Sequence, residues 1–203
     1  MKLLHRPDLY GWSRFDESRN IDFHSVLWRR SEGNIVIDPL ALSDHERARL
    51  AELGGVRHVV ITNSDHVRAA AELIASSGAQ SYGPRGEADT FPIRCDAWLA
   101  DGDEIAPGLT ALGLEGSKTP GELALLLEGT TLITGDLIRA HAGGRLDMLL
   151  SAKLCDAALA QRSLERLAAL PGLEAVLPGD GWPIFRDGQR ALGELLLRVR
   201  AAV

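Results

Sequence analysis

The sequence predicts an α/β protein, more narrowly α+β, in which two mixed and mostly antiparallel β-sheets lie between outer helices as an αββα sandwich. Three observations predict it: short apolar runs that suit buried strands, glycine-containing turns between paired runs, and helical segments with recognisable ends. No linker, low-complexity stretch or repeat of fixed period interrupts the chain, so we expect residues 1–203 to form one domain.

The expected strands come from apolar or β-branched runs that turn residues bound. Glycine-containing turns at Ser31–Gly33 and Glu128-Gly129 predict two hairpins. An Asp-Gly turn signal lies within residues 98–105, in a middle third that is rich in strand-forming residues. The expected strands cover residues 23–30, 34–38, 56–62, 109–114, 122–127, 131–134 and 174–177.

The expected helices have start and stop signals. Ser43 and Glu46 form a capping box before the first helix, and Gly54-Gly55 ends it. Asn63 or Ser64 can cap the second helix. The expected helices cover residues 46–53, 65–77, 156–170 and 189–202.

Composition narrows the class of function. The chain carries 28 acidic and 22 basic residues, a formal net charge of −6, which does not suit a nucleic-acid partner. It has no run of eighteen apolar residues and no signal-peptide pattern at its start, so we expect a cytoplasmic protein with no membrane partner. Cys95 and Cys155 belong to no CxxC unit and suit reduced thiols. A small-molecule substrate or ligand is the expected partner, and the size is compatible with a homodimer.

The histidines exclude one kind of metal site. Six are present, and no two of them lie closer than eight positions in the chain. A site built on an H-x-H or H-x₃-H pair is therefore absent.

Residues with catalytic or ligand chemistry gather in four polar segments, each after an apolar run. Loops at strand ends often carry function because a rigid sheet aims several of them at one point. The segments are Thr62–His66, Lys118–Gly121, Thr134–Asp136 and Pro178–Gly181. Their candidate functional residues are Asp65, His66, Lys118, Asp136 and Asp180.

The order of these segments resembles the metallo-β-lactamase superfamily, which has an αββα fold and a metal centre. The family carries H-x-H-x-D-H, a histidine before a T/S-P-G turn, a T-G-D aspartate and a final G-H-G. The matching stretches here are NIVIDP at 34–39, VITNSDH at 60–66, KTPGELALLL at 118–127, LITGDL at 132–137 and VLPGDG at 176–181. The resemblance covers about residues 20–185.

The resemblance implies an altered metal centre. The positions of the three histidines that hold the family's first metal are occupied by Ile61, Asn63 and Lys118. The ligand set that remains for the second metal is Asp65, His66, Asp136 and Asp180. The implied centre is therefore at most mononuclear, which does not support a binuclear zinc hydrolase. Its oxygen-rich ligands suit Mn, Fe or Mg better than Zn.

Three carboxylates that converge need positive charge or a proton. Each like-charge pair a few ångströms apart costs about 3–4 kcal/mol at an effective dielectric constant near 20. A divalent cation could relieve this repulsion, Lys118 could place its ammonium among the carboxylates, or one carboxyl group could stay protonated.

Two functions are compatible with these residues. In the first, a metal-dependent hydrolase holds one divalent metal (Mn, Fe, Mg or Zn) that activates water, with Asp65 and Lys118 in catalysis and Lys118 stabilising the oxyanion. In the second, no metal binds, Lys118 supplies the charge, and the inactive cleft binds a small molecule or partner. In both, Asn63, Ser64 and Trp182 are expected to line the pocket. The substrate is not identified.

Overall fold

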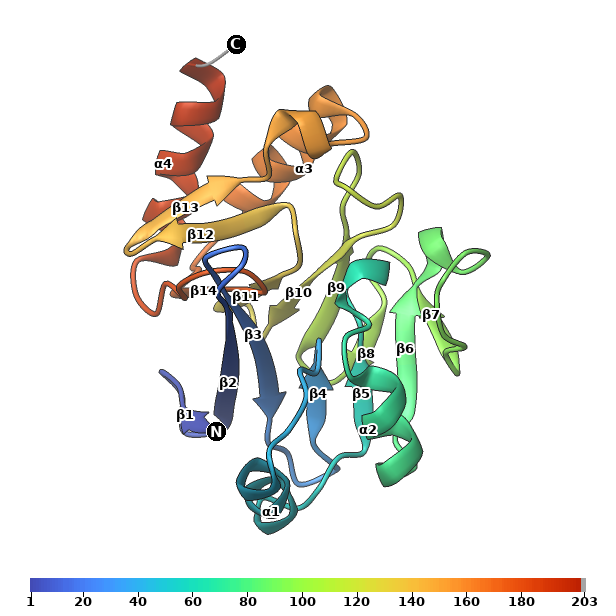
Figure 1. Cartoon of the computed structure of the whole chain (residues 1–203). Helices are drawn as coiled ribbons and strands as arrows, with labels where there is room; N and C mark the ends of the chain where they lie inside the picture. The colour runs from blue at the N-terminus through green and yellow to red at the C-terminus, as the bar shows by residue number, and fades with distance from the viewer. Residues whose placement is uncertain (202–203) are drawn as a thin grey trace.

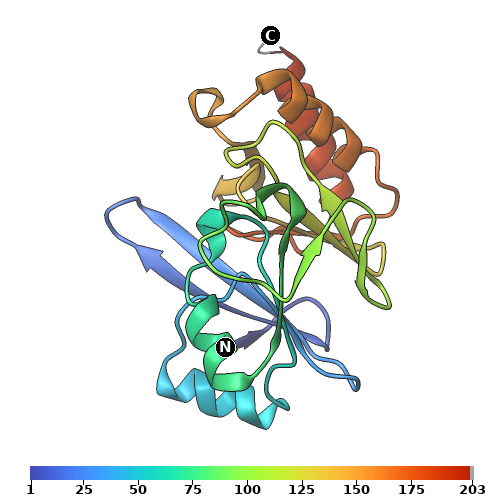
Figure 2. The same cartoon turned by 90° about the vertical axis from the view of Figure 1, so that its right-hand side faces the viewer.

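In the computed structural model, which describes residues 1–201, two β-sheets are stacked between two pairs of helices (Figure 1). Figure 2 shows α1 (Asp44–Glu52) and α2 (Ala70–Ser77) on one side of the stack, and α3 (Ala157–Ala168) and α4 (Gly188–Ala201) on the opposite side. This arrangement is the αββα sandwich that the sequence predicts.

The first sheet has seven strands in chain order, from β1 to β7. Strands β1 to β4 pair antiparallel, whereas β4 to β7 pair parallel. This half of the sheet departs from the mostly antiparallel expectation, because crossovers through α1, through α2 and through residues 85–96 return the chain to the same edge each time. The strands are β1 (Lys2–Leu3), β2 (Leu9–Asp16), β3 (Ile21–Trp28), β4 (Ile35–Ile37), β5 (His58–Val60), β6 (Gln80–Pro84) and β7 (Ala97–Leu99).

The second sheet has five strands in the order β14-β11-β10-β9-β8, and only β11 and β14 pair parallel. The Asp-Gly turn within residues 98–105 carries the chain from β7 in the first sheet to β8 in the second. The strands are β8 (Glu104–Ala106), β9 (Leu109–Gly113), β10 (Leu123–Leu127), β11 (Thr131–Thr134) and β14 (Ala175–Pro178).

A separate hairpin, β12 (Ile138–Ala142) and β13 (Arg145–Met148), follows the Thr-Gly-Asp segment. The sequence does not predict it, because its short strands mix arginine, histidine and alanine rather than alternating cleanly. The hairpin is important for the site because it carries Arg139.

Three apolar layers hold the stack together. The layer between the two sheets includes Val60 and Leu125, the layer under α1 and α2 includes Leu50 and Leu73, and the layer under α3 and α4 includes Leu164. Burial of leucine, isoleucine and valine in each layer drives the packing of these elements. The sheet edges that carry the polar segments are therefore held rigidly.

Two local predictions can be checked at helix starts. The capping box of Ser43 and Glu46 is present at the start of α1. The helix expected over residues 65–77 is instead divided into a 3₁₀ turn (Ser64–His66) and α2, because Arg68 has a positive φ of 45° that no α-helix accommodates.

The end of the described chain also bears on the predictions. The helix expected over residues 189–202 corresponds to α4, and residue 202 lies outside the described residues.

Among residues 1–201, no helix is both long enough and apolar enough to cross a membrane.

Candidate functional site

The polar segments meet at one cleft of about 700 Å³. All five candidate residues from the sequence line it: Asp65, His66, Lys118, Asp136 and Asp180. They come from both sheets, because the 3₁₀ turn follows β5 while the other segments belong to loops around β10, β11 and β14. The cleft therefore lies where the ends of the two sheets come together.

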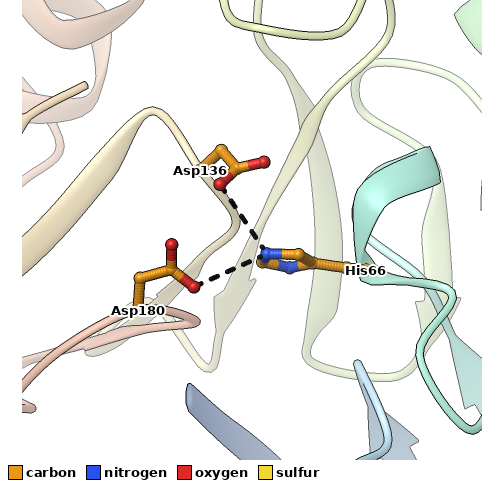
Figure 3. Close-up of side chains that lie close together, drawn as sticks. All are labelled: His66, Asp136 and Asp180. Atoms are coloured by element: carbon orange, nitrogen blue, oxygen red, sulfur yellow. Dashed lines mark ion pairs between the residues drawn. The ribbon is translucent and has the colours of Figure 1, made fainter. Parts of the chain in front are cut away.

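Three of these residues form the buried centre of the cleft. Nε2 of His66 lies 3.9 Å from Oδ1 of Asp136 and 3.8 Å from Oδ1 of Asp180 (Figure 3). One donor atom from each residue lies within 4.8 Å of the others, and all three side chains are buried. The structure thus brings together three of the four residues that the resemblance implies as ligands.

Two glycines and the Asn63 cap allow the loops of the buried centre to pack closely. The side-chain oxygen of Asn63 accepts hydrogen bonds from the backbone N–H groups of Asp65 and His66, at 3.0 and 3.1 Å. A Cβ at Gly179 would lie 2.6 Å from Cε1 of His66, and one at Gly135 would lie 2.8 Å from Nδ2 of Asn63. Gly179 therefore lets its loop approach the imidazole ring, and Gly135 lets its loop approach the Asn63 cap.

Asp38, which belongs to the NIVIDP stretch but is not among the candidate residues from the sequence, orients His66. It lies at the end of β4, and its Oδ2 accepts a hydrogen bond from Nδ1 of His66 at 2.7 Å. It also accepts from the backbone N–H of Thr62 at 2.8 Å and from its hydroxyl at 2.6 Å. These contacts leave Nε2 of His66 directed toward Asp136 and Asp180.

Opposing effects act on the protonation of His66. Burial lowers its pKa, and the neighbouring Arg68 lowers it further, but the carboxylates of Asp38 and Asp136 outweigh both. The net result is a pKa above the ordinary histidine value. The same Asp38–His66 pairing, against the cost of burial, holds the pKa of Asp38 below its usual value.

Arg139 lies between the two buried aspartates. Its Nη2 donates to Oδ2 of Asp180 at 2.7 Å and to Oδ1 of Asp136 at 3.2 Å. The three side chains are 10% exposed or less. The guanidinium group therefore occupies the position between carboxylates that a bridging cation would take.

Arg68 approaches the same centre from the opposite side. Its Nη2 lies 3.2 Å from Nε2 of His66 and 3.5 Å from Oδ1 of Asp180. Its Nη1 donates to the carbonyl of His24 at 2.6 Å, which anchors the side chain. The positive φ of 45° at Arg68 is unfavourable for a residue with a long side chain, so these contacts hold a strained backbone in place.

Lys118 and Asp65 pair with each other at the rim of the cleft rather than at its centre. Their side chains are 42% and 43% exposed. In this structure Asp65 therefore lies apart from the cluster of His66, Asp136 and Asp180, and its place in the metal set stays a prediction. Arg68 and Arg139 lie closer to the buried carboxylates than Lys118 does, so in this structure the arginines supply most of their counter-charge.

The three expected pocket residues lie outside the cleft lining. Asn63 is buried as the cap described above, and the backbone N–H of Ser64 donates to the carboxylate of Glu87 at 2.9 Å. Trp182 is 60% exposed and lines a different pocket of about 480 Å³ together with His24. The side chain expected to line the pocket with the candidate residues therefore lies at a neighbouring pocket instead.

A fourth carboxyl group is buried behind the centre. Glu122 accepts hydrogen bonds from the hydroxyl of Ser117 and from the backbone N–H of Leu137. Burial, assisted by the negative charge of Asp136, raises the pKa of Glu122 to about 7. The two hydrogen bonds tie Glu122 to the loop that carries Asp136.

The donor atoms can be tested for their fit to a metal ion. A histidine nitrogen and two carboxylate oxygens are ligands that could hold one divalent cation. However, Arg139 and Arg68 place guanidinium nitrogens within 3.5 Å of all three residues. The permanent positive charges of the two arginines already lie beside Asp136 and Asp180, so a dication would be repelled by its neighbours. The centre in this arrangement does not fit a resident metal.

Solved structures show which fold this is. A metallo-β-lactamase from Pontibacter korlensis is 16% identical, with a TM-score of 0.75 over 98% of this chain and 97% of its own. A metallo-β-lactamase family protein from Thermus thermophilus is 20% identical, with a TM-score of 0.72 over 97% of this chain and 80% of its own. The mono-zinc form of the FIM-1 metallo-β-lactamase from Pseudomonas aeruginosa is 15% identical, with a TM-score of 0.70 over 94% of this chain and 90% of its own.

Sequence comparison gives the family. No curated protein sequence matches the chain. The family model described as "Metallo-beta-lactamase superfamily" matches residues 1–199. The resemblance expected from the four polar segments is thus confirmed, and the chain belongs to the metallo-β-lactamase superfamily.

Proposed function

We propose that this protein is a hydrolase-like, small-molecule-binding member of the superfamily in which Arg68 and Arg139 take the place of the metal charge. The observation that carries the proposal is the double contact of Arg139, whose Nη2 donates to both Asp136 and Asp180. A guanidinium group stays charged at any physiological pH, and its planar donors suit two carboxylates at once. It therefore supplies the positive charge for which members of this superfamily commonly use a divalent metal such as zinc.

The chemistry available to such a centre follows from its own residues. Asp38 fixes the ring of His66, so that Nε2 can hold or release a proton next to the cleft. Arg68 and Arg139 place permanent positive charge beside it, where negative charge on a bound molecule would be stabilised. This combination supports binding of a small molecule and is compatible with hydrolase-like proton transfer.

A second candidate is the mononuclear metal-dependent hydrolase. It is favoured by the three donor atoms within 4.8 Å and by Oδ2 of Asp136, which is buried and has no hydrogen-bond partner among the described residues. In this candidate, Arg139 would have to leave its position, and His66, Asp136 and Asp180 would hold one ion of Mn, Fe, Mg or Zn.

Metal analysis separates the two candidates. Protein purified without chelator, incubated with Mn²⁺ or Zn²⁺ and then desalted, is expected to retain far less than one ion per chain. Arg139→Gln is expected to gain metal, because it leaves Asp136 and Asp180 without their guanidinium. Arg145→Gln is the matched control, since Arg145 lies on the same hairpin and is exposed. One ion per wild-type chain, lost in Asp136→Ala, would overturn the proposal in favour of the second candidate.

A further inference from the structure

We infer that the ligand of this cleft is a small organic anion, with a phosphate or carboxylate group on an apolar body. The inference rests on the proposed function, because it takes the centre to be free of metal and its arginines to be in place. It is carried by the charge of the cleft, by the donors that its internal ion pairs leave free, and by its apolar wall.

The cleft is cationic in a protein that is acidic. Five basic side chains line it, against three carboxylates, while the whole chain has a formal net charge of −6. The basic residues are Arg19, Arg68, Lys118, Arg139 and Lys153. Such a local reversal of sign concentrates anions at the cleft and repels cations.

Not all of the basic side chains in the cleft are paired with its carboxylates. Asp65 is paired with Lys118, and Asp136 and Asp180 are paired within the buried centre. Lys153, on the 3₁₀ turn before α3, has no ion-pair partner in the described part of the chain. Arg19, at the tip of the β2–β3 hairpin, has only a distant contact of 3.8 Å with Asp16, outside the cleft.

A buried donor is also left over at the centre. Arg139 makes both of its carboxylate contacts through Nη2, and its Nε is buried without a hydrogen-bond partner among residues 1–201. A buried N–H without a partner is costly, and an oxygen acceptor on a ligand or a water would relieve that cost. An anion can thus be received without breaking the pairs that hold the centre.

One wall of the cleft is apolar. Ile21, Phe23 and Leu149 contribute to it, and the Phe23 ring lies 5.4 Å from the guanidinium of Arg68 and 5.9 Å from that of Arg19. A volume of about 700 Å³ suits a small molecule. The anionic group would therefore lie toward the basic side chains while an apolar body covers Phe23.

Calorimetry with a matched set of probes tests this inference on chelator-treated protein at low salt. The probes are phenyl phosphate, benzoate, benzyl alcohol, benzylamine and inorganic phosphate. Phenyl phosphate and benzoate are expected to bind at least about tenfold more tightly than benzyl alcohol or benzylamine, a difference of about 1.4 kcal/mol. The comparison of phenyl phosphate with benzoate identifies the preferred anion, and weaker binding of inorganic phosphate supports the apolar wall.

Variants locate the binding. Lys153→Ala and Arg19→Ala are expected to weaken phenyl phosphate binding several-fold, and the double variant more strongly. Arg49→Ala is the control, because Arg49 is an exposed arginine on α1, far from the cleft lining. Equal affinity for benzylamine and benzoate, or unchanged affinity in the double variant, would overturn the inference.

The outcomes also separate this inference from the proposed function. Metal-free protein that binds none of the anions contradicts the inference and leaves the arginine centre intact. A second outcome is one metal ion per wild-type chain together with anion binding that chelation abolishes. This outcome contradicts the proposed metal-free centre, and with it the inference that the arginines bind the anion.

Discussion

Two groups of ion pairs lie in the same cleft, and they differ in burial. At the rim, Lys118 pairs with Asp65, and the side chains are 42% and 43% exposed. At the centre, Arg139 pairs with Asp136 and Asp180, and none of the three side chains is more than 10% exposed. The chemistry of the partners is similar, so burial is the main difference between the two groups.

This difference decides which group controls the site. An exposed pair can exchange its partner for water at little cost, so it contributes little to stability. A buried charge cannot, and losing its partner leaves an uncompensated charge in a low dielectric. The buried group therefore fixes both the folded state and the ability of the centre to receive a cation.

The largest effect is expected from breaking the buried group with Arg139→Met. Methionine fills much of the arginine volume but leaves Asp136 and Asp180 without a counter-charge. The free energy of unfolding, measured by urea denaturation at neutral pH, is expected to fall by about 3–5 kcal/mol.

Arg145→Met provides the control for that measurement. Arg145 lies on the same hairpin, and its side chain is 56% exposed and pairs with Asp147 at 3.2 Å. Its replacement is expected to cost less than about 1 kcal/mol. Similar losses in the two variants would show that burial does not distinguish these ion pairs.

Glu122 is a buried carboxyl group without a basic partner among residues 1–201, so the pH dependence of stability tests what burial alone does to such a group. Its pKa of about 7, against 4.5 for the ordinary group, means that the folded protein keeps a proton that the unfolded chain loses. Stability is therefore expected to fall as pH rises from about 4.5 to 7, by about 3 kcal/mol at most.

Glu122→Gln removes that titration while keeping the shape of the side chain. Denaturation at several pH values measures the unfolding free energy of both proteins. The difference, wild type minus variant, is expected to decline between pH 5 and about pH 8. A difference that stays constant over this range would contradict a buried, protonated Glu122.

Asp38→Asn tests the link between the buried group and His66. Asparagine tolerates the positive φ of 49° at this position, so the backbone can stay in place. Loss of the carboxylate is expected to lower the pKa of His66, because Asp38 is the strongest of the groups that raise it. An NMR titration of the His66 ring measures this change directly.

The same variant has a stability effect with a defined sign. A raised histidine pKa stabilises the folded state below the unfolded pKa of 6.5, and this contribution is lost as pH rises through the folded pKa. The cost of Asp38→Asn is expected to be about 2 kcal/mol at pH 6 and smaller at alkaline pH. A cost that grows with pH would argue against a charged pair.

The fold could be predicted from the sequence because its signals are local and repeated. The structure has strands at the apolar runs 122–127 and 131–134. It also has the capping box that Ser43 and Glu46 predict. The sequence does not predict β1, β2, β6 or the β12–β13 hairpin, since their residues are few or mix polar and apolar side chains without a clear period. Pairing with neighbouring strands determines their conformation.

The site was predicted in part, for a physical reason. The family resemblance brings His66, Asp136 and Asp180 together, and the repulsion between carboxylates indicates a cation, Lys118 or a bound proton as the means of relief. In the structure two arginines lie beside the carboxylates, and matching a family position does not show which long side chain reaches the centre. Arg68 and Arg139 follow His66 and Asp136 by two and three residues, a spacing that reads as an ordinary charged segment without the structure.

The smallest effect is expected at the rim, from Lys118→Met. One alternative from the sequence places this lysine among the buried carboxylates, in which case its loss would destabilise the fold strongly. The structure pairs it with the exposed Asp65, so the free energy of unfolding is expected to change by less than about 1 kcal/mol. Asp65→Asn should give a similarly small change, and the double variant should match either single one, because both remove the same pair. If Lys118→Met lost as much unfolding free energy as Arg139→Met, Lys118 would have to interact with the buried carboxylates. The distinction between rim and centre would then be wrong.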